Sequence, residues 1–315
     1  MNSTLLADNS EASLKKFLNT LSAVDEVGAK ARVEMLGTRS IKTSSKNWAI
    51  DLAIRMVDLT TLEGADTSGK VRALCAKGVY PDPTDLTVPS VGAICVYNDM
   101  VKIARQALDA GGGKNIPVAA VSTAFPSGRA SIEVKIQDTR DAIANGATEI
   151  DMVIDRGAFL AGKLGYVFDQ IRTIKEVCGS DIHLKVILET GELVTLDNVR
   201  KASYLAMLAG ADFIKTSTGK VAPAATAPVV YVMLEAVRDY YKMTGTRIGV
   251  KPAGGIRNTK DAIKQLVLVN EIAGPEWLDP SLFRIGASAL LNDLLMQRMK
   301  MRDGYYASPN YVTLD

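Results

Sequence analysis

Two lysines stand where a chain of mostly apolar strands would not be expected to place a charge. Lys215 ends the apolar run of ADFIKTS (211–217), and Lys251 ends that of RIGVKPA (247–253). Lysine is rarely buried without a partner. Neighbouring strands lie about 4.8 Å apart, so two such lysines could bring their ammonium groups together. A like charge and burial both favour the neutral amine, which attacks carbonyl groups to form a Schiff base.

A carboxylate is predicted to face these lysines. In TEIDMVI, the period-two alternation of a strand puts Glu149 and Asp151 on one face. If this face points inward, Asp151 lies across the barrel mouth from Lys215 and can act as a general base. Asp58 and Thr60, from DLTTL, could complete a polar network at the end of an earlier strand.

Three glycine-rich turns are suited to bind phosphate. They are STGK, PAGGIR and IGAS, and each follows a predicted strand. The residues that they supply are Thr218, Gly219, Lys220, Gly254, Gly255, Gly286 and Ser288. Glycine lets backbone N–H groups approach an anion closely, and the helix expected after IGAS adds a favourable dipole. TSTGK is not a Walker A loop, because the first glycine of that spacing is missing.

Each of these residues also has a plain structural interpretation. Either lysine alone could extend its stem to solvent, and Asp151 could cap a helix or pair with Arg156. The paired glycines could be ordinary turn residues. Cys95 is explained most simply as a small core residue, and His183 as structural. The two lysines together, each leading into a glycine turn, favour the catalytic interpretation.

The elements that must position these residues recur along the chain. Short apolar runs are predicted as strands, and helical periodicity fills the intervals between them. The expected strands are 53–60, 91–97, 116–123, 148–154, 182–190, 211–217, 247–253 and 282–288. Eight strands alternating with helices over about 250 residues predict an α/β fold, a parallel (β/α)8 TIM barrel. An open doubly wound sheet is the alternative, although no dinucleotide-binding glycine turn follows an early strand.

Three regions are expected along the chain. Residues 1–50 are predicted to form a helical extension packed on the barrel, and 51–300 the catalytic barrel. Residues 301–315 are predicted to form a C-terminal tail that is short enough to be disordered or to fold over a pocket.

The composition argues against several classes of function. The chain has 315 residues, of which 47% are hydrophobic and 23% charged, and its net charge is +2. Without basic runs interleaved with aromatic residues we expect no nucleic-acid partner, and without a long apolar span no membrane association. The single histidine excludes a metal site built on several imidazoles, and we expect neither metal nor cofactor. Three dispersed cysteines and no secretory signal indicate a cytoplasmic protein.

The motif series resembles that of the deoxyribose-phosphate aldolases, a family of class I aldolases. DLTTL, AICVY, ATEIDMVI, LKVILETGEL, GADFIKTSTGK, GVKPAGGIR and FRIGAS follow one another in the family's order over residues 54–295. FIKTSTGK together with KPAGGIR is close to a family signature. The longer N-terminal region and WLDPSLFRIGAS resemble the eukaryotic-type branch.

The resemblance implies reversible cleavage of the phosphosugar 2-deoxy-D-ribose 5-phosphate to D-glyceraldehyde 3-phosphate and acetaldehyde. It implies that Lys215 forms the Schiff base, that Lys251 lowers its pKa and relays protons, and that Asp151 is the acid/base. Supporting or substrate-lining roles fall to Asp58, Thr60, Cys95 and Thr218. Phosphate-binding roles fall to Gly219, Lys220, Gly254, Gly255, Gly286 and Ser288.

The chain departs from the family pattern at two places. Ala289 stands where some relatives have a second serine, and the terminal tyrosine of well-studied members has three candidates here, Tyr305, Tyr306 and Tyr311. A class I aldolase or transaldolase for another phosphosugar is the alternative function within enzymes. A barrel that binds a phosphosugar or a protein without turnover is the alternative outside them. A homodimer is the expected assembly.

Overall fold

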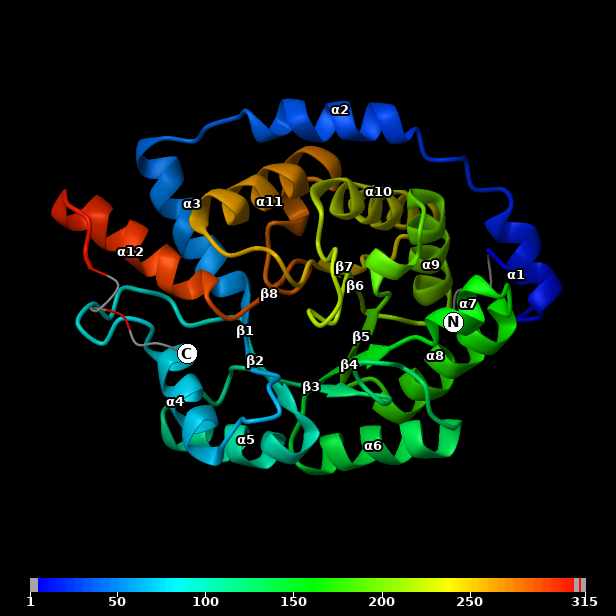
Figure 1. Cartoon of the computed structure of the whole chain (residues 1–315), viewed down its shortest axis with the longest axis horizontal. Coiled ribbons are helices and arrows are strands. Elements are labelled where there is room, and N and C mark those ends of the chain that lie inside the picture. The colour runs from blue at the N-terminus through cyan, green and yellow to red at the C-terminus, as the bar shows by residue number, and fades with distance from the viewer. Residues whose placement is uncertain (1–4, 309–311, 313–315) are drawn as a thin grey trace.

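The computed structural model describes residues 5–308 and 312, and its centre is a barrel of parallel strands surrounded by helices (Figure 1). The strands are β1 (Val57–Thr60), β2 (Ala93–Tyr97), β3 (Val118–Ser122), β4 (Glu149–Val153), β5 (His183–Ile187), β6 (Phe213–Lys215), β7 (Gly249–Lys251) and β8 (Ile285–Ala287). They follow the order β7-β6-β5-β4-β3-β2-β1-β8, so strands adjacent in the chain are adjacent in space. The predicted TIM barrel is confirmed.

The barrel closes between β7 and β8 through isolated bridges. Val250 pairs with Phe283, and Ala253 pairs with Gly286. The other neighbouring strands pair over runs of at least three residues. The seam therefore runs directly beside Lys251, the last residue of β7.

Helices cover the outside of the barrel. They are α4 (Ser68–Val79), α5 (Val101–Ala110), α6 (Ile132–Ala144), α7 (Arg156–Leu160), α8 (Leu164–Cys178), α9 (Leu196–Leu208), α10 (Ala227–Thr244), α11 (Thr259–Ile272) and α12 (Leu290–Asp303), with the 3-10 turns Asn98–Met100, Thr190–Glu192 and Pro275–Trp277. Thr67, Thr195 and Asn258 begin α4, α9 and α11 by accepting a hydrogen bond from the N–H three residues on, which satisfies a free helix donor. Across the described residues, none of the helices is long and apolar enough to cross a membrane.

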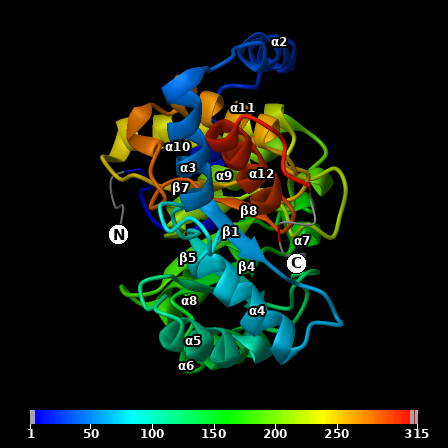
Figure 2. The same ribbon diagram turned by 90° about the vertical axis from the view of Figure 1, so that its left-hand side faces the viewer.

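Three helices precede the barrel: α1 (Glu11–Leu18), α2 (Glu26–Gly37) and α3 (Thr43–Met56). They pack on the outer helices: α1 on α8 and α9 (Figure 1), and α2 on α10 and α11 and α3 on α11 and α12 (Figure 2). The first strand was predicted to begin at residue 53, which is wrong, because residues 53–56 complete α3. A short buried apolar run has the same pattern in a helix as in a strand.

The barrel interior is divided between charged and apolar side chains. Asp58, Glu149, Asp151, Lys185, Lys215 and Lys251 are all at most 2% exposed and project from β1 and from β4 to β7. A small apolar cluster, Leu62, Cys95, Ala119 and Val121, packs on the side of β2 and β3. Barrel interiors are usually filled by branched apolar residues. The charged side chains in this interior must therefore find their ion-pair partners among one another.

Lys135 on α6 is a buried lysine away from the barrel interior. It is 0% exposed, and its Nζ donates to the neutral Oε1 of Gln170 at 2.8 Å. Burial lowers the pKa of Lys135, and Asp155 only partly opposes this. We expect Lys135→Met to raise the free energy of unfolding at neutral pH by about 1–2 kcal/mol, because the cost of burying the charge is removed.

Urea unfolding at several pH values tests this expectation. The folded pKa of Lys135 lies below its unfolded value, so the cost is present at neutral pH and disappears as the pH rises through the folded and then the unfolded pKa. The gain in Lys135→Met should shrink accordingly. An equal or lower stability at neutral pH would contradict it.

Candidate active site

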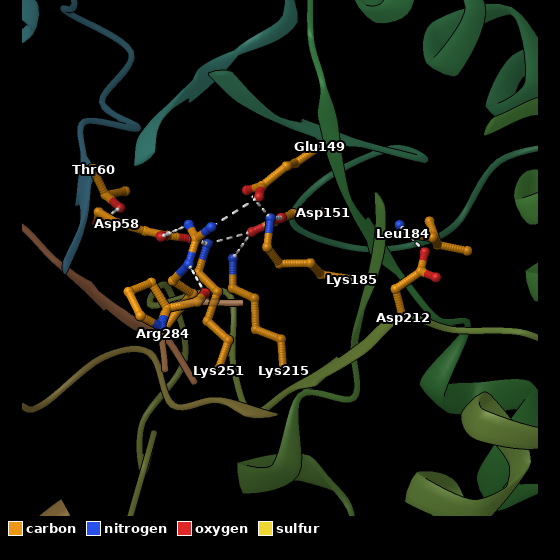
Figure 3. Close-up of polar contacts among 11 residues, drawn as sticks. Asp58, Thr60, Glu149, Asp151, Leu184, Lys185, Asp212, Lys215, Lys251 and Arg284 are labelled. Carbon is orange, nitrogen blue, oxygen red and sulfur yellow. Dashed lines mark hydrogen bonds and ion pairs between the residues drawn. The ribbon is translucent and has the colours of Figure 1, made fainter. Parts of the chain in front are cut away.

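Asp151 is the carboxylate on which three lysines converge (Figure 3). The Nζ atoms of Lys215 and Lys251 both donate to its Oδ2 at 2.7 Å, and Nζ of Lys185 donates to its Oδ1 at 3.2 Å. The strand register explains this arrangement. Lys215 pairs with Lys251 between β6 and β7, and Asp151 pairs with Lys185 between β4 and β5. The predicted juxtaposition of the two strand-end lysines is confirmed.

A second group of charges packs against the first. Oδ2 of Asp58 lies 2.5 Å from Nζ of Lys251. The guanidinium of Arg284 donates to Oδ1 of Asp58 at 2.7 Å and to Oε1 of Glu149 at 3.2 Å. Glu149 also accepts a hydrogen bond from Lys185. Each of these residues is at most 6% exposed, so each charge depends on its partners rather than on water.

The network holds one more basic than acidic group. Its four basic groups are Lys185, Lys215, Lys251 and Arg284, and its three acidic groups are Asp58, Glu149 and Asp151. Among described residues Lys215 pairs with one carboxylate, whereas each other basic group pairs with two. An uncompensated buried charge is costly. Lys215 is therefore the basic group whose deprotonation disturbs the fewest ion pairs.

The pKa values of the groups around Lys215 keep these groups charged in the resting site. Burial disfavours the ionised form of Asp151, but the surrounding lysines outweigh it and hold the pKa well below the usual value. For Asp58, Lys251 and Arg284 outweigh burial and lower the pKa. For Lys251, Asp151 and Asp58 outweigh burial and hold the pKa well above the usual value. Asp58 and Asp151 are thus ionised, and Lys251 is charged, at neutral pH.

Gly286 makes the room that Lys251 occupies. A Cβ at this position would lie 2.9 Å from Cβ of Ala253 and 3.3 Å from Cε of Lys251. Both distances are shorter than the roughly 3.5–4.0 Å at which carbon atoms pack favourably. Gly286 therefore positions the lysine stem as well as lining the neighbouring pocket.

A pocket of about 350 Å³ adjoins the network at Lys215. The predicted site residues that line it are Thr60, Lys215, Thr218, Gly219, Lys220, Gly254, Gly255, Gly286 and Ser288. Asp58, Asp151 and Lys251 lie in the buried network instead. The volume is at the lower end of the range of roughly 300–1,000 Å³ for small-molecule sites. Lys215 is thus the lysine that the network presents to a ligand.

The loops after β6 and β7, together with α4, give one part of this pocket a positive lining. Lys220 and Arg257 lie on these loops and Lys70 on α4, and Glu63 from the loop after β1 lies beside them. Nζ of Lys220 is 2.9 Å from Oε1 of Glu63. Gly254 has φ +82°, and a Cβ on it would lie 2.7 Å from Cβ of Ala224, so this turn requires glycine. The pocket therefore has the amine of Lys215 on one side, and cationic side chains and glycine backbone on the other.

Three predicted residues have contacts that limit their roles. The hydroxyl of Thr60 donates to the carbonyl of Asp58 at 2.7 Å. The hydroxyl of Thr218 donates to Oε2 of Glu189 at 2.5 Å. Burial raises the pKa of the Cys95 thiol. This thiol belongs to the apolar cluster of the barrel interior, where it is unsuited to act as a nucleophile.

The tail tyrosines that the structure describes do not line the pocket. Tyr305 and Tyr306 are 69% and 63% exposed, and Nζ of Lys300 lies 3.6 Å from the ring centroid of Tyr306. The pocket is lined by residues between 60 and 289. Tyr311 lies outside the described residues, so its contribution stays a prediction.

Lys185, Arg284 and Glu63 were not predicted as site residues. Lys185 interrupts the apolar run IHLKVILET, and Arg284 interrupts LFRIGAS. This is the signal that singled out Lys215, and it could have found both. Glu63 lies in a polar loop, where a charged residue does not stand out from its neighbours.

The fold and site together define a (β/α)8 barrel enzyme that presents a lysine amine from the end of a strand. A family model described as "DeoC/LacD family aldolase" matches residues 52–295. The chain belongs to this aldolase family, and it is accordingly an enzyme of the lyase class.

Curated relatives match most of the chain. It is 47% identical over 288 residues to human deoxyribose-phosphate aldolase, covering 88% of this chain and 89% of the human protein. The mouse deoxyribose-phosphate aldolase is 46% identical over 278 residues, covering 86% and 87%. The solved deoxyribose phosphate aldolase from Aeropyrum pernix, described as tetrameric, shares the fold with a TM-score of 0.62, 24% identity and coverage of 84% and 97%.

Replacement of Asp151 should reveal how far the network depends on this carboxylate. We expect Asp151→Asn to lower the free energy of unfolding at neutral pH by about 3–5 kcal/mol, because buried ammonium groups lose their shared partner. The folded pKa of Asp151 lies below its unfolded value, so its contribution is present above pH 3.8 and lost as the pH falls. The difference from wild type should therefore shrink in acid.

Urea unfolding measures this difference. Asp169→Asn is the matched control, since Asp169 forms an exposed pair with Arg172 and such pairs contribute about 0–1 kcal/mol. Equal effects of the two substitutions would show that the lysines do not depend on Asp151.

Proposed function

We propose that this protein cleaves 2-deoxy-D-ribose 5-phosphate reversibly to D-glyceraldehyde 3-phosphate and acetaldehyde through a Schiff base on Lys215. The observation that carries the proposal is the position of Lys215. It lines the pocket, and its ammonium contacts a single carboxylate, whereas Lys185 and Lys251 are buried behind it with two each. The curated relatives named deoxyribose-phosphate aldolase support the choice of substrate.

The proposed chemistry starts with the neutral amine of Lys215. It attacks the C1 aldehyde of the open-chain sugar, and loss of water gives an iminium. A base takes the proton of the C3 hydroxyl, the C2–C3 bond breaks, and its electron pair moves to the iminium. D-Glyceraldehyde 3-phosphate leaves, and the remaining enamine is protonated at C2. Hydrolysis then releases acetaldehyde and restores the amine.

Asp151 and Lys251 are the groups that we propose to move the protons. Oδ2 of Asp151 accepts from both Lys215 and Lys251 at 2.7 Å, so a proton from Lys215 has a direct route into the network. In the resting site Lys251 is a cation beside Lys215, and a nearby like charge disfavours a second one. Once Lys215 has lost its charge, Asp151 and Lys251 are proposed to exchange protons with the substrate. Asp58 supports Lys251 by ion pairing at 2.5 Å.

The positive part of the pocket is proposed to hold the phosphate. Lys220 supplies the charge, and the glycine-rich turns supply backbone N–H groups. The residues assigned to this role are Gly219, Lys220, Gly254, Gly255, Gly286 and Ser288. Thr60 and Thr218 are proposed to line the sugar, and Cys95 to lie near it.

Cellular setting and assembly belong to the same proposal. A cytoplasmic location is supported by three free buried cysteines, Cys75, Cys95 and Cys178, which suit a reducing compartment. A role in deoxyribonucleotide catabolism follows from the proposed substrate. A homodimer is our expectation for the assembly.

Reductive trapping tests the proposed nucleophile. Incubation with acetaldehyde and cyanoborohydride should add an ethyl group at Lys215, since hydride reduces the iminium to a secondary amine. Lys215→Met should abolish both this modification and the cleavage of deoxyribose 5-phosphate. Lys220→Met is the matched control, and it should keep the trapping while raising KM for the phosphorylated sugar.

The outcome separates the candidate functions. Trapping at another lysine would overturn the assignment of Lys215. Trapping at Lys215 without cleavage of deoxyribose 5-phosphate, but with cleavage of a 2-hydroxylated phosphosugar, would favour the alternative aldolase or transaldolase. No trapping with retained phosphosugar binding would favour a barrel without turnover.

Glu63 should oppose substrate binding in the proposed phosphate site. Lys220 must exchange its contact with Glu63 for the phosphate, and two anions would then be close together. We expect Glu63→Gln to lower KM for the phosphosugar about 2–5-fold, as befits a partly exposed pair, with little change in kcat. Glu176→Gln, at an exposed position of α8, is the control, and an unchanged KM in Glu63→Gln would argue against this exchange.

A further inference from the structure

Arg284 is the charge in the barrel interior that pH cannot remove. Arginine stays protonated in proteins, and here the carboxylates of Asp58 and Glu149 outweigh burial and raise its pKa further. Each of its three guanidinium nitrogens has a partner, since Nε donates to the carbonyl of Pro280 while the two terminal nitrogens donate to the carboxylates. It is 6% exposed and lies just before β8, away from the pocket lining.

The contacts of Arg284 connect it to Lys215 through two routes (Figure 3). One route runs through Asp58 to Lys251 and on to Asp151. The other runs through Glu149 and Lys185 to the same carboxylate. Neither Arg284 nor Glu149 lines the pocket, so both act on the reaction indirectly, through the buried groups between them and Lys215.

We infer that Arg284 and Glu149 are positioning residues that set, through the charge balance of the buried network, the pH at which Lys215 releases its proton. The inference rests on the proposed function, in which the neutral amine of Lys215 is the nucleophile. With Lys215 protonated, the network of four basic and three acidic groups has a net charge of +1. Release of one proton balances it, and Arg284 supplies the excess charge that makes this release favourable.

The titratable and charged groups around Lys215 lie on two sides. In the barrel interior they are Asp58 from β1, Cys95 from β2, Glu149 and Asp151 from β4, Lys185 from β5, Lys251 from β7 and Arg284 before β8. Across the pocket they are Lys70, Lys220, Arg257 and Glu63, which stay the same in every variant compared below. Cys95 is uncharged at neutral pH because burial raises its pKa. Within the buried network the balance therefore depends on three carboxylates, two further lysines and Arg284.

Single substitutions should move the balance in opposite directions. Arg284→Met gives a net charge of 0 with Lys215 protonated, so that release of the proton would leave an excess of negative charge. Glu149→Gln gives +2 and favours release. Arg284→Met combined with Glu149→Gln gives +1, as in the wild type. A change of one unit charge within this buried network is expected to shift the midpoint by about one pH unit.

The experiment is the rate of cyanoborohydride trapping of acetaldehyde at Lys215 as a function of pH. The midpoint of the profile should move up by about one pH unit or more in Arg284→Met and down by a similar amount in Glu149→Gln. The double variant should return to the wild-type midpoint. Arg284→Lys, which keeps a positive charge, should lie closer to the wild type than Arg284→Met does.

The result distinguishes this inference from a structural role and from failure of the proposed function. Loss of packing alone would make the double variant worse than either single variant, without restoring the midpoint. Unmoved midpoints in folded variants, checked by circular dichroism, would overturn the inference. Should Arg284→Met fail to fold, Glu149→Gln alone decides, since an unmoved or raised midpoint there overturns it. Absence of trapping at Lys215 in the wild type would instead reject the proposed function.

Discussion

The structure of this barrel interior depends on one carboxylate, Asp151, which is the shared ion-pair partner of three buried lysines. Three lysines from three strands end on its two oxygens, and all three are buried away from water. Buried ammonium groups repel one another unless an anion lies between them. The inward-pointing lysines of β5, β6 and β7 therefore depend on a carboxylate of β4 that all three contact. Glu149 and Asp58 then extend the same alternation of charge to Arg284.

This interaction determines what the rest of the fold has to provide. Strands that carry charges inward must be covered on their outer faces, and α8 to α11, with α1 to α3 outside them, supply that cover. The side of β2 and β3 carries an apolar cluster that includes Ala119 and Val121. A ligand in the pocket therefore meets polar groups on one side, while the neighbouring interior offers little that could react with it.

Local pattern explains why much of the site could be predicted from the sequence. A charge that ends an apolar run marks the mouth of a parallel strand, and Lys215 and Lys251 were found in this way, whereas Asp151 was found from the period-two alternation of its strand. The contacts of Arg284 could not be found locally, because Glu149 is 135 residues away in the chain and strand register alone brings the two together. The start of β1 was misplaced because the end of α3 is as apolar as a strand.

Barrel closure and the pocket meet at the seam between β7 and β8. The polypeptide joins these strands only by isolated bridges, at Val250 with Phe283 and at Ala253 with Gly286. The loops on its two sides carry Gly254 and Ser288, which line the same pocket. An anion bound by both loops would connect β7 and β8 across the seam. The bound substrate would then stabilise the closure of the barrel at the place where the strands themselves form the fewest pairings.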